Sequence, residues 1–234
     1  MKKIAIMQPY FLPYIGYWQL IGAVDEFVLY DNIEYTKKGW FNRNRIINNG
    51  QDRLITIPIK NESDFLKVNE RHLSDNSHQE IQRIIRIIEA TYRKSPYFDE
   101  AFPIIKKCLE YPELNLFKYI FHSIEVIGEY IGISTKITLS SSVQIDHSLK
   151  AEEKVLAICR FLNATTYINA IGGRELYNPD QFLTEGIELK FIKSKDIKYK
   201  QFDNEFVPWL SIIDVMMFND KSSIKKLTQE YDLI

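Results

Sequence analysis

The chain has 234 residues, 45% of them hydrophobic and 26% charged, with a formal net charge of -1 at pH 7. These values are typical of a globular protein with a real core, and they exclude an overall basic field for binding nucleic acid. No stretch approaches the ~18 apolar residues of a membrane span, and the apolar run after Met1-Lys2-Lys3 is too short for a secretion signal. We therefore expect a cytoplasmic protein without a membrane span.

The first expected element is a β-α-β unit. Short apolar runs at Lys3–Met7 and Glu26–Tyr30 flank Tyr14–Val24, a stretch long enough for a helix, and this pattern predicts two parallel strands. A β-hairpin is predicted next, over Asn42–Ile59, because two strand-like runs flank Asn49-Gly50. That dipeptide is a strong signal for a two-residue hairpin turn.

Three apolar stripes at helical spacing follow the hairpin. They comprise Ile81, Ile84, Ile85, Ile88 and Tyr92; then Ile104, Ile105, Cys108 and Leu109; then Ile120, Ile124, Ile127 and Ile131. A proline at 96 and a glycine at 132 separate and end them, so three helices are predicted. We place these helices in an insertion over residues 64–132, embedded in a single domain that spans residues 1–234.

Strand patterns resume in the C-terminal half. Runs at 135–142, 165–173 and 187–193 are typical of strands, and a helical stripe that includes Cys159 lies between the first two. The predicted fold is therefore α/β, with a mostly parallel sheet of about five strands and with the hairpin and helices inserted after the second. Cys108 and Cys159 fall on apolar helical positions, so we expect core side chains and no disulfide.

A further helix is predicted over Pro208–Asp220, since proline suits a first helical turn and apolar residues recur at helical spacing. Asp214 lies on or beside the apolar stripe of this helix. An unpartnered carboxylate there would cost several kcal/mol. We therefore predict that Asp214 pairs with a cation or accepts backbone N–H bonds, and that its role is structural rather than catalytic.

Polar residues follow every predicted strand, and ligands of open parallel sheets bind outside these carboxyl ends. The residues are Gln8, Pro9 and Tyr10; Asp31 and Asn32; Ser140, Ser141 and Ser142; Asn169, Gly172, Gly173 and Arg174; and Lys193, Ser194 and Lys195. The serine triplet and the glycine pair would offer hydroxyls and backbone amides to a phosphate or carboxylate oxygen. The alternative is that these loops are polar only because they are exposed.

The segment Tyr35–Gln51 is basic and aromatic, with four cations and no acidic residue. Arg43 and Lys38 would neutralise a phosphate group, and Trp40 would stack on a ring. Polar residues, among them Asn42, occupy both faces of the predicted strand, which favours a binding role over the alternative of a solvated hairpin face.

Known catalytic and metal-binding patterns are not found. His72, His78, His122 and His147 lack the spacing of a zinc site, so we expect no metal ligands. No nucleophile elbow or Walker loop is present, and the sequence specifies neither a cofactor nor an oligomeric state. Motifs alone therefore indicate an anion-binding α/β site.

Six segments in order along the chain resemble the WbqC-like family. They are "QPYFLPYIGYWQLI", "KKGWFNRNRI", "TYRKSPYF", "SSS", "YINAIGG" and "PWLSIIDVMMFN". Members of that family are found among genes for bacterial surface-polysaccharide and O-antigen synthesis. The resemblance therefore implies a role in making or decorating a sugar precursor.

The first β-α unit also resembles the nucleotidyltransferase (HUP-like) superfamily, in which a His-x-Gly-His turn holds nucleotide phosphates. Tyr14-Ile15-Gly16-Tyr17 falls on that turn, with both histidines replaced by tyrosine. The resemblance implies that Gly16 lets a ligand approach the helix N-terminus and that Pro9 and Pro13 fix the approach. The replaced histidines argue against adenylyl transfer itself. An aromatic plug at the edge of the sheet is the alternative.

These observations and resemblances together lead to a functional hypothesis. The protein would bind a nucleotide-linked sugar or another activated donor and transfer a small acyl or aminoacyl group during surface-glycan synthesis. Gln8, Asn42 and Asn169 would orient polar groups of the ligand. Tyr10 or Tyr17 would act as a hydrogen-bond donor or acid, and Asp31 as a base or, alternatively, as an Asx-turn cap. Two alternatives are a non-catalytic accessory subunit that binds the glycan precursor and a nucleotidyltransferase or ligase-like enzyme.

Overall fold

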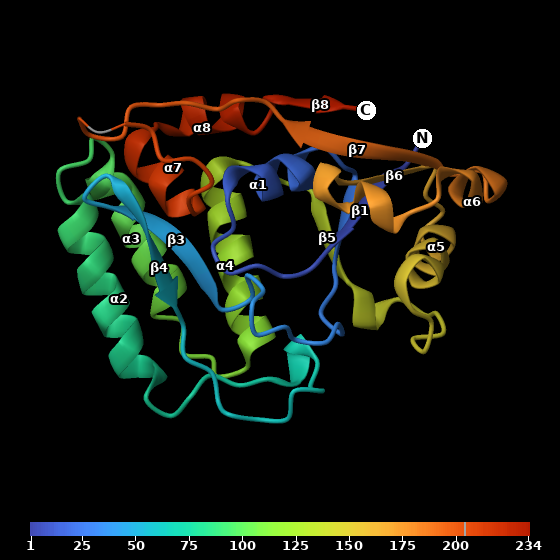
Figure 1. The fold of residues 1–234 in the computed structure, drawn as a ribbon, viewed down its shortest axis with the longest axis horizontal. Helices are drawn as coiled ribbons and strands as arrows, with labels where there is room; N and C mark the ends of the chain where they lie inside the picture. Colours follow the sequence, from blue (N-terminus) through green and yellow to red (C-terminus); the bar gives the residue numbers. More distant parts are fainter. Residues whose placement is uncertain (204) are drawn as a thin grey trace.

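A computed structural model describes residues 1–203 and 205–234, which form a six-stranded sheet and a separate hairpin (Figure 1). In spatial order the sheet strands are β5 (Lys136–Leu139), β2 (Glu26–Leu29), β1 (Lys3–Met7), β6 (Thr166–Ala170), β7 (Glu188–Ser194) and β8 (Tyr231–Leu233). The first five are parallel, and β8 is antiparallel to β7. The α/β class and the mostly parallel sheet are confirmed. The sixth strand escaped prediction because three residues are too few to show an alternating pattern.

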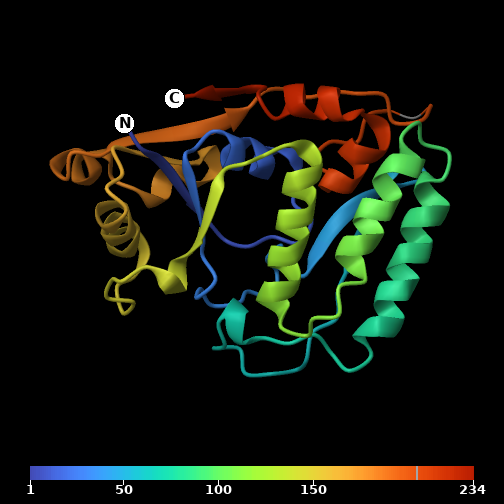
Figure 2. The ribbon, with the colours of Figure 1, turned by 180° about the vertical axis from the view of Figure 1, so that it is seen from behind.

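Helices connect and cover the strands. They are α1 (Ile15–Gly22), α2 (Ser77–Tyr92), α3 (Phe98–Leu109), α4 (Leu116–Ile131), α5 (Ala151–Phe161), α6 (Pro179–Thr184), α7 (Ile212–Phe218) and α8 (Lys221–Leu227), with short 3₁₀ helices η1 (Val68–Glu70), η2 (Ser140–Ser142) and η3 (Ile171–Leu176). Seen from behind, α4 lies between the sheet and α3, with α2 outermost (Figure 2). The three predicted helices α2, α3 and α4 are present, while their separate status as an insertion over 64–132 stays a prediction.

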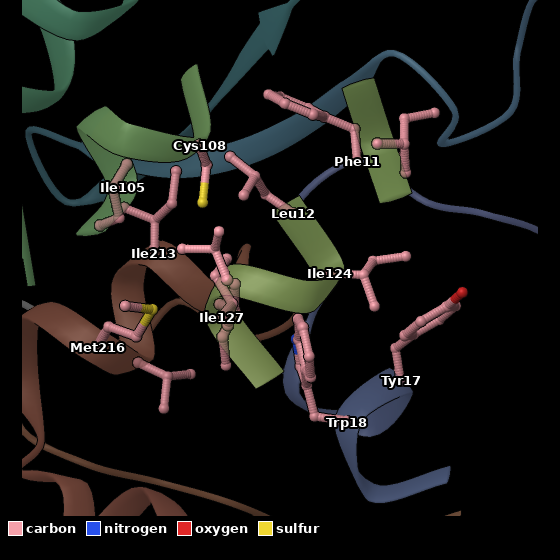
Figure 3. Close-up of a cluster of buried hydrophobic side chains, with 14 of the residues drawn as sticks. Phe11, Leu12, Tyr17, Trp18, Ile105, Cys108, Ile124, Ile127, Ile213 and Met216 are labelled. Carbon is pink, nitrogen blue, oxygen red and sulfur yellow. The ribbon is translucent and has the colours of Figure 1, made fainter. Parts of the chain in front are cut away.

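The central strand β1 serves two cores because its side chains alternate between the faces of the sheet. Ala5 packs into the larger core with α1, α4 and α7, while Ile4 and Ile6 face the smaller core with α5. Trp18 and Ile127 show how α1 and α4 meet in the larger core (Figure 3). The two cysteines are buried and unbonded, as expected: one lies in each core.

The hairpin consists of β3 (Arg43–Asn48) and β4 (Gln51–Thr56), as predicted. At its tip, Asn49 and Gly50 have φ values of 51° and 75°, the left-handed conformation that a two-residue type I′ turn requires at both positions. The backbone N–H of Ile47 donates to the hydroxyl of Tyr92 on α2 at 3.1 Å. The hairpin is therefore attached to the helical layer as well as to its own partner strand.

Helix α7 differs from prediction at its start and in the partners of Asp214. It begins at Ile212 rather than Pro208, because Trp209 has a φ of 62° and cannot belong to a helix. The buried Asp214 carboxylate accepts hydrogen bonds from the hydroxyls of Tyr92 (2.9 Å) and Tyr199 (2.7 Å) and from Gln201 Nε2 (2.6 Å). A partner was correctly expected, but these three side chains take the place of the predicted cation or backbone N–H groups.

Candidate functional site

The strand order creates a natural ligand position at one edge of the sheet. Numbered along the chain, the five parallel strands lie in the order 3-2-1-4-5, so the chain builds outward from β1 and then returns to build outward on the other side from β6. Ligands of such sheets bind at the carboxyl ends of the strands where this reversal occurs. The carboxyl ends of β1 and β6 meet there, and a cavity of about 700 Å³ opens beside them.

We call this space the strand-end cavity. Its wall is formed by residues within 6–20, 30–33, 40–45, 151–155 and 169–177 and by Trp209. Aromatic rings and amide side chains make up much of it. Among the described residues that line it, Arg45 and Glu152 are the charged ones. The cavity is therefore suited to a ligand that combines a flat ring with polar or anionic groups.

Hydrogen bonds from β3 and from α1 itself hold the loop between β1 and α1 in a tight corner. Asn44 Nδ2 donates to the carbonyls of Phe11 and Leu12, at 2.8 Å each, and Trp18 Nε1 donates to the Pro13 carbonyl at 3.1 Å. Leu12 adopts a φ of 44°, a left-handed conformation that is unfavourable for leucine and needs such support. The aromatic and proline-rich start of the chain thus builds a rigid wall.

Two tyrosines fix Gln8 at this wall. Tyr10 donates its hydroxyl to Gln8 Oε1 at 3.2 Å, and Tyr17 donates to the Gln8 carbonyl at 2.9 Å. Gly16 was expected to leave room for a ligand at the start of α1. Instead, a Cβ at Gly16 would lie 2.4 Å from a ring atom of Tyr14, so the missing side chain makes room for the Tyr14 ring.

The cavity mouth carries two tryptophans and one arginine. The Arg45 guanidinium lies 5.6 Å from the centroid of the Trp40 ring and donates to the Trp209 carbonyl at 3.2 Å. The Trp209 ring meets Tyr14 edge-on at 5.9 Å. Because Trp40 is 36% and Trp209 61% exposed, both rings are accessible for stacking on a ligand.

Three residues predicted in the basic segment have other positions. Arg43 lies 5.8 Å from the Trp40 centroid, but its guanidinium donates to the carbonyls of Gly39 and Lys38 and so closes that loop. Lys38 is exposed to solvent. Asn42 is buried between the hydroxyl of Tyr35, which donates to it at 2.9 Å, and the carbonyl of Ile57. None of the three lines the strand-end cavity.

Asn169, at the end of β6, contributes an amide to the opposite wall. Its Nδ2 donates to the Tyr167 hydroxyl at 3.1 Å, and its Oδ1 accepts from the Ala170 backbone at 2.7 Å. A Cβ at Gly173 would lie 3.2 Å from the Asn169 amide, so this glycine accommodates Asn169. Gly172 has no atom within 4 Å of its Cβ position, which leaves its surroundings open.

Asp31 lies outside the cavity lining, and both of its carboxylate oxygens accept hydrogen bonds. Its carboxylate accepts from the hydroxyl of Ser140 and the backbone N–H of Ser141, both at 2.9 Å, and from Asn69 Nδ2 at 3.0 Å. These bonds tie β2 to η2 and η1. The geometry thus gives Asp31 and Ser141 a role in joining segments, and a catalytic role for Asp31 stays a prediction.

The tyrosine side chains that line the cavity are held in their neutral, protonated form. Burial raises the pKa of Tyr10, Tyr14 and Tyr17, and a neighbouring tyrosine raises that of Tyr10 and Tyr17 further. These phenols therefore stay protonated at neutral pH and serve as hydrogen-bond donors. The Glu152 carboxylate accepts a hydrogen bond from the Asn178 backbone.

The structure brings most of the predicted site residues together. Those lining the cavity are Gln8, Tyr10, Gly16, Tyr17, Trp40, Asn169, Gly172 and Gly173, and those outside it are Pro9, Asp31, Lys38, Asn42, Arg43 and Ser141. The aromatic, charged and amide side chains of the lining that the predicted site left out are Tyr14, Tyr30, Asn44, Arg45, Glu152, Tyr177 and Trp209. Arg45 shares strand parity with Arg43 and could have been found by that signal, whereas Trp209 carries no comparable signal.

Two further properties concern metal binding and membranes. Among the described residues, no group of three or more histidine, cysteine or acidic side chains is arranged to hold a metal ion. Within the same part of the chain, no helix has the length and apolar character needed to cross a bilayer.

Comparisons with known proteins identify relatives but no solved structure. The model of the WbqC-like protein family matches residues 8–226. The uncharacterized protein Rv1507c of Mycobacterium tuberculosis is 30% identical over 221 residues, which cover 94% of each chain. No solved structure matches, so the expected likeness to nucleotidyltransferases has no structural neighbour to support it.

Proposed function

We propose an enzymatic role in bacterial surface-glycan synthesis for this chain, which belongs to the WbqC-like protein family. The proposed ligand is a nucleotide-linked sugar or another activated donor. The proposed reaction transfers a small acyl or aminoacyl group from an activated donor to the nitrogen of an amino sugar. The new N–acyl bond forms as the bond between the acyl group and the donor's leaving group breaks, and the leaving group departs with that electron pair. Both the ligand and the reaction rest on the character of the strand-end cavity.

The observation that carries this proposal is the position and chemistry of one cavity. It opens at the sheet edge where the strand order reverses and has a volume of about 700 Å³, within the usual range for small-molecule sites. A nucleotide sugar presents a flat base, phosphates and a hydroxyl-rich ring. The cavity offers exposed tryptophan faces, one guanidinium and several amides to match these groups.

The roles follow from position. Trp40 and Trp209 stack on the base, Arg45 pairs with a phosphate, and the amides of Gln8 and Asn169 orient sugar hydroxyls. Glu152 is the carboxylate that lines the cavity, so we favour it over Asp31 as the base that takes a proton from the attacking amine.

Binding measurements with matched arginine variants test the proposal. Calorimetry with a panel of nucleotide sugars should identify a ligand that also raises the melting temperature. Arg45→Gln should weaken its binding by roughly 1.5–3 kcal/mol, the range for a lost charge-assisted hydrogen bond. Arg43→Gln, on the same strand but outside the cavity, serves as the control and should have a much smaller effect. A panel without any ligand, or equal losses in both variants, would contradict the proposal.

A non-catalytic role in binding the same glycan precursor is the second candidate. Two observations favour it. The raised pKa values of Tyr10 and Tyr17 keep these phenols protonated, and the Glu152 carboxylate already accepts a hydrogen bond from the Asn178 backbone. Neither the tyrosines nor Glu152 is then an evident base. Glu152→Gln separates the two. The enzymatic role expects binding without turnover in this variant, whereas the accessory role expects no turnover in the unmodified protein either. Nucleotidyl transfer is not proposed, because Tyr14 fills the space beside Gly16 at the start of α1.

A further inference from the structure

A second concavity lies between the tip of the hairpin and helix α2, and we call it the basic groove. It has a volume of about 670 Å³ and includes Asn49 and Gly50 of the hairpin turn. Figure 1 shows the hairpin and α2 side by side at the end of the molecule away from α5 and α6. None of its lining residues belongs to the strand-end cavity. The two spaces are therefore distinct sites.

The charged side chains described in the lining of the basic groove are all positive. Its lining includes the cations Arg53, Arg83, Arg86, Arg93 and Lys94 and, among the described residues, no carboxylate. Arg83 forms an exposed pair with Glu80 on its own helix at 3.3 Å. The other four cations form no ion pair with any residue that the structure describes.

Three acidic residues adjoin groove residues along the chain, namely Asp52, Glu89 and Asp203, and none of them lines the groove. Asp52 pairs with Arg45 at 3.4 Å, and the almost fully exposed Asp203 pairs with Lys200 at 3.4 Å. Because exposed charges are strongly screened by solvent, these carboxylates offset only part of the positive charge in the groove.

Helix electrostatics explain only part of this cluster. Arg93 and Lys94 lie at the carboxyl end of α2, where cations interact favourably with the helix dipole. Arg86 lies within the helix and Arg53 on the neighbouring strand β4, so neither gains from that interaction. Arg86 and Arg93 are two turns apart, which places both on the same face of α2, toward the groove.

We propose that the basic groove binds an anionic small molecule that carries two or more phosphate groups. Several like charges around one concavity repel one another, and an oligophosphate relieves that repulsion. Guanidinium groups match the geometry of phosphate with paired N–H donors. The size of the groove suits a small molecule, and the hairpin turn adds amide side chains at its edge. This site does not depend on the function proposed for the strand-end cavity.

Calorimetric titration with sodium tripolyphosphate, at constant ionic strength in chloride, tests this site. The double variant Arg86→Gln/Arg93→Gln should weaken binding by at least about tenfold, because two charge-assisted contacts are lost. Lys106→Gln/Lys107→Gln on the exposed face of α3 removes the same charge outside the groove and should leave the affinity unchanged. Arg45→Gln should also leave it unchanged, which separates this site from the strand-end cavity.

A stability measurement shows whether the groove variant still folds. Without oligophosphate, the arginine double variant should melt at or above the temperature of the unmodified protein, because charge repulsion is reduced. Tripolyphosphate should raise the melting temperature of the unmodified protein but not of this variant. Absent binding of tripolyphosphate, or equal weakening by the α3 variant, would overturn the proposal. So would arginine-dependent binding of single-stranded DNA alone, which would assign the groove to a polyanionic macromolecule.

Discussion

Asp31 and Asp214 are both buried carboxylates, with 2% and 0% of their surface exposed, but the two regions satisfy them differently. Asp31 accepts from one hydroxyl, one backbone N–H and one side-chain amide at the ends of strands. Asp214 accepts from two phenols and one amide deep in the larger core. Each carboxylate joins segments that are far apart in the sequence.

The comparison teaches that a carboxylate at a strand end can hold segments of the chain together much as one in the core does. Asp31 was predicted as a base because it follows a buried strand, and Asp214 was predicted as structural because it lies in an apolar stripe. In the structure each carboxylate accepts three hydrogen bonds from protein groups. What differs is access to water, since Ser141 is exposed, while two partners of Asp214, Tyr92 and Gln201, are buried and the third, Tyr199, is half-buried.

The largest expected effect comes from Asp214→Ala. This change leaves two phenols and Gln201 without their acceptor in the core, so we expect a loss of about 3–5 kcal/mol in the free energy of unfolding. Urea denaturation measures it. Asp203→Ala, at an exposed position, should change stability by less than about 0.5 kcal/mol. A loss below about 1 kcal/mol at Asp214 would show that its hydrogen bonds contribute little.

Asp31→Ala should cost less, about 2–3 kcal/mol, because water can reach some of the freed donors at the strand ends. Denaturation at the same pH measures this loss. Ser142→Ala is a nearby control, whose hydroxyl donates only to the Leu139 carbonyl within its own turn. An Asp31→Ala protein of unchanged stability that binds ligand but has lost turnover would return Asp31 to a catalytic role.

Tyr92→Phe should have a smaller effect still, roughly 1–2 kcal/mol. Its hydroxyl donates to Asp214 and accepts from the Ile47 backbone, so its removal weakens the network around one carboxylate without touching the other. Tyr97→Phe is a matched control, because the Tyr97 hydroxyl makes no hydrogen bond to a described residue. A loss at Tyr97 as large as that at Tyr92 would indicate that the lost hydroxyl itself is not the cause.

The smallest expected effect is a pH dependence that distinguishes Asp214. Burial raises its pKa, although hydrogen bonds from Tyr199, Gln201 and Tyr92 act in the opposite direction. The folded state therefore holds this proton more tightly than the unfolded state, and the associated stability is present at low pH and lost as pH rises through the folded pKa. The Asp214→Asn protein should lack this pH-dependent part of the free energy of unfolding. Denaturation of both proteins from pH 4 to 8 tests it, and parallel curves would contradict the raised pKa.

Features set by local sequence were predicted well. Short apolar runs identified the strands, and Gln8 and Asn169, which follow two of these strands, both line the strand-end cavity. The Asn49-Gly50 turn identified the hairpin, because its conformation depends on those two residues alone. Helical spacing identified α2, α3 and α4, since their buried faces are wide and regular.

Features set by tertiary contacts were not predictable in the same way. Arg43 and Arg45 have the same strand parity, and only the folded loop at residues 38–39 diverts Arg43 from the cavity. Asn42 looked like a ligand-binding amide, but its partners come from Tyr35 and Ile57. The lack of a side chain at Gly16 makes room for the ring of Tyr14, which belongs to the same loop. Each of these depends on contacts that no sequence pattern encodes.

The central position of β1 has a consequence for the order of folding. Its partners are β2, some twenty residues along the chain, and β6, which begins at Thr166. During synthesis the first strand must therefore wait, with one hydrogen-bonding edge open, until most of the polypeptide has left the ribosome. Pairings across such long sequence separations slow folding and leave an exposed edge vulnerable to aggregation. The yield of folded protein should therefore depend on synthesis speed and on chaperones that shield that edge.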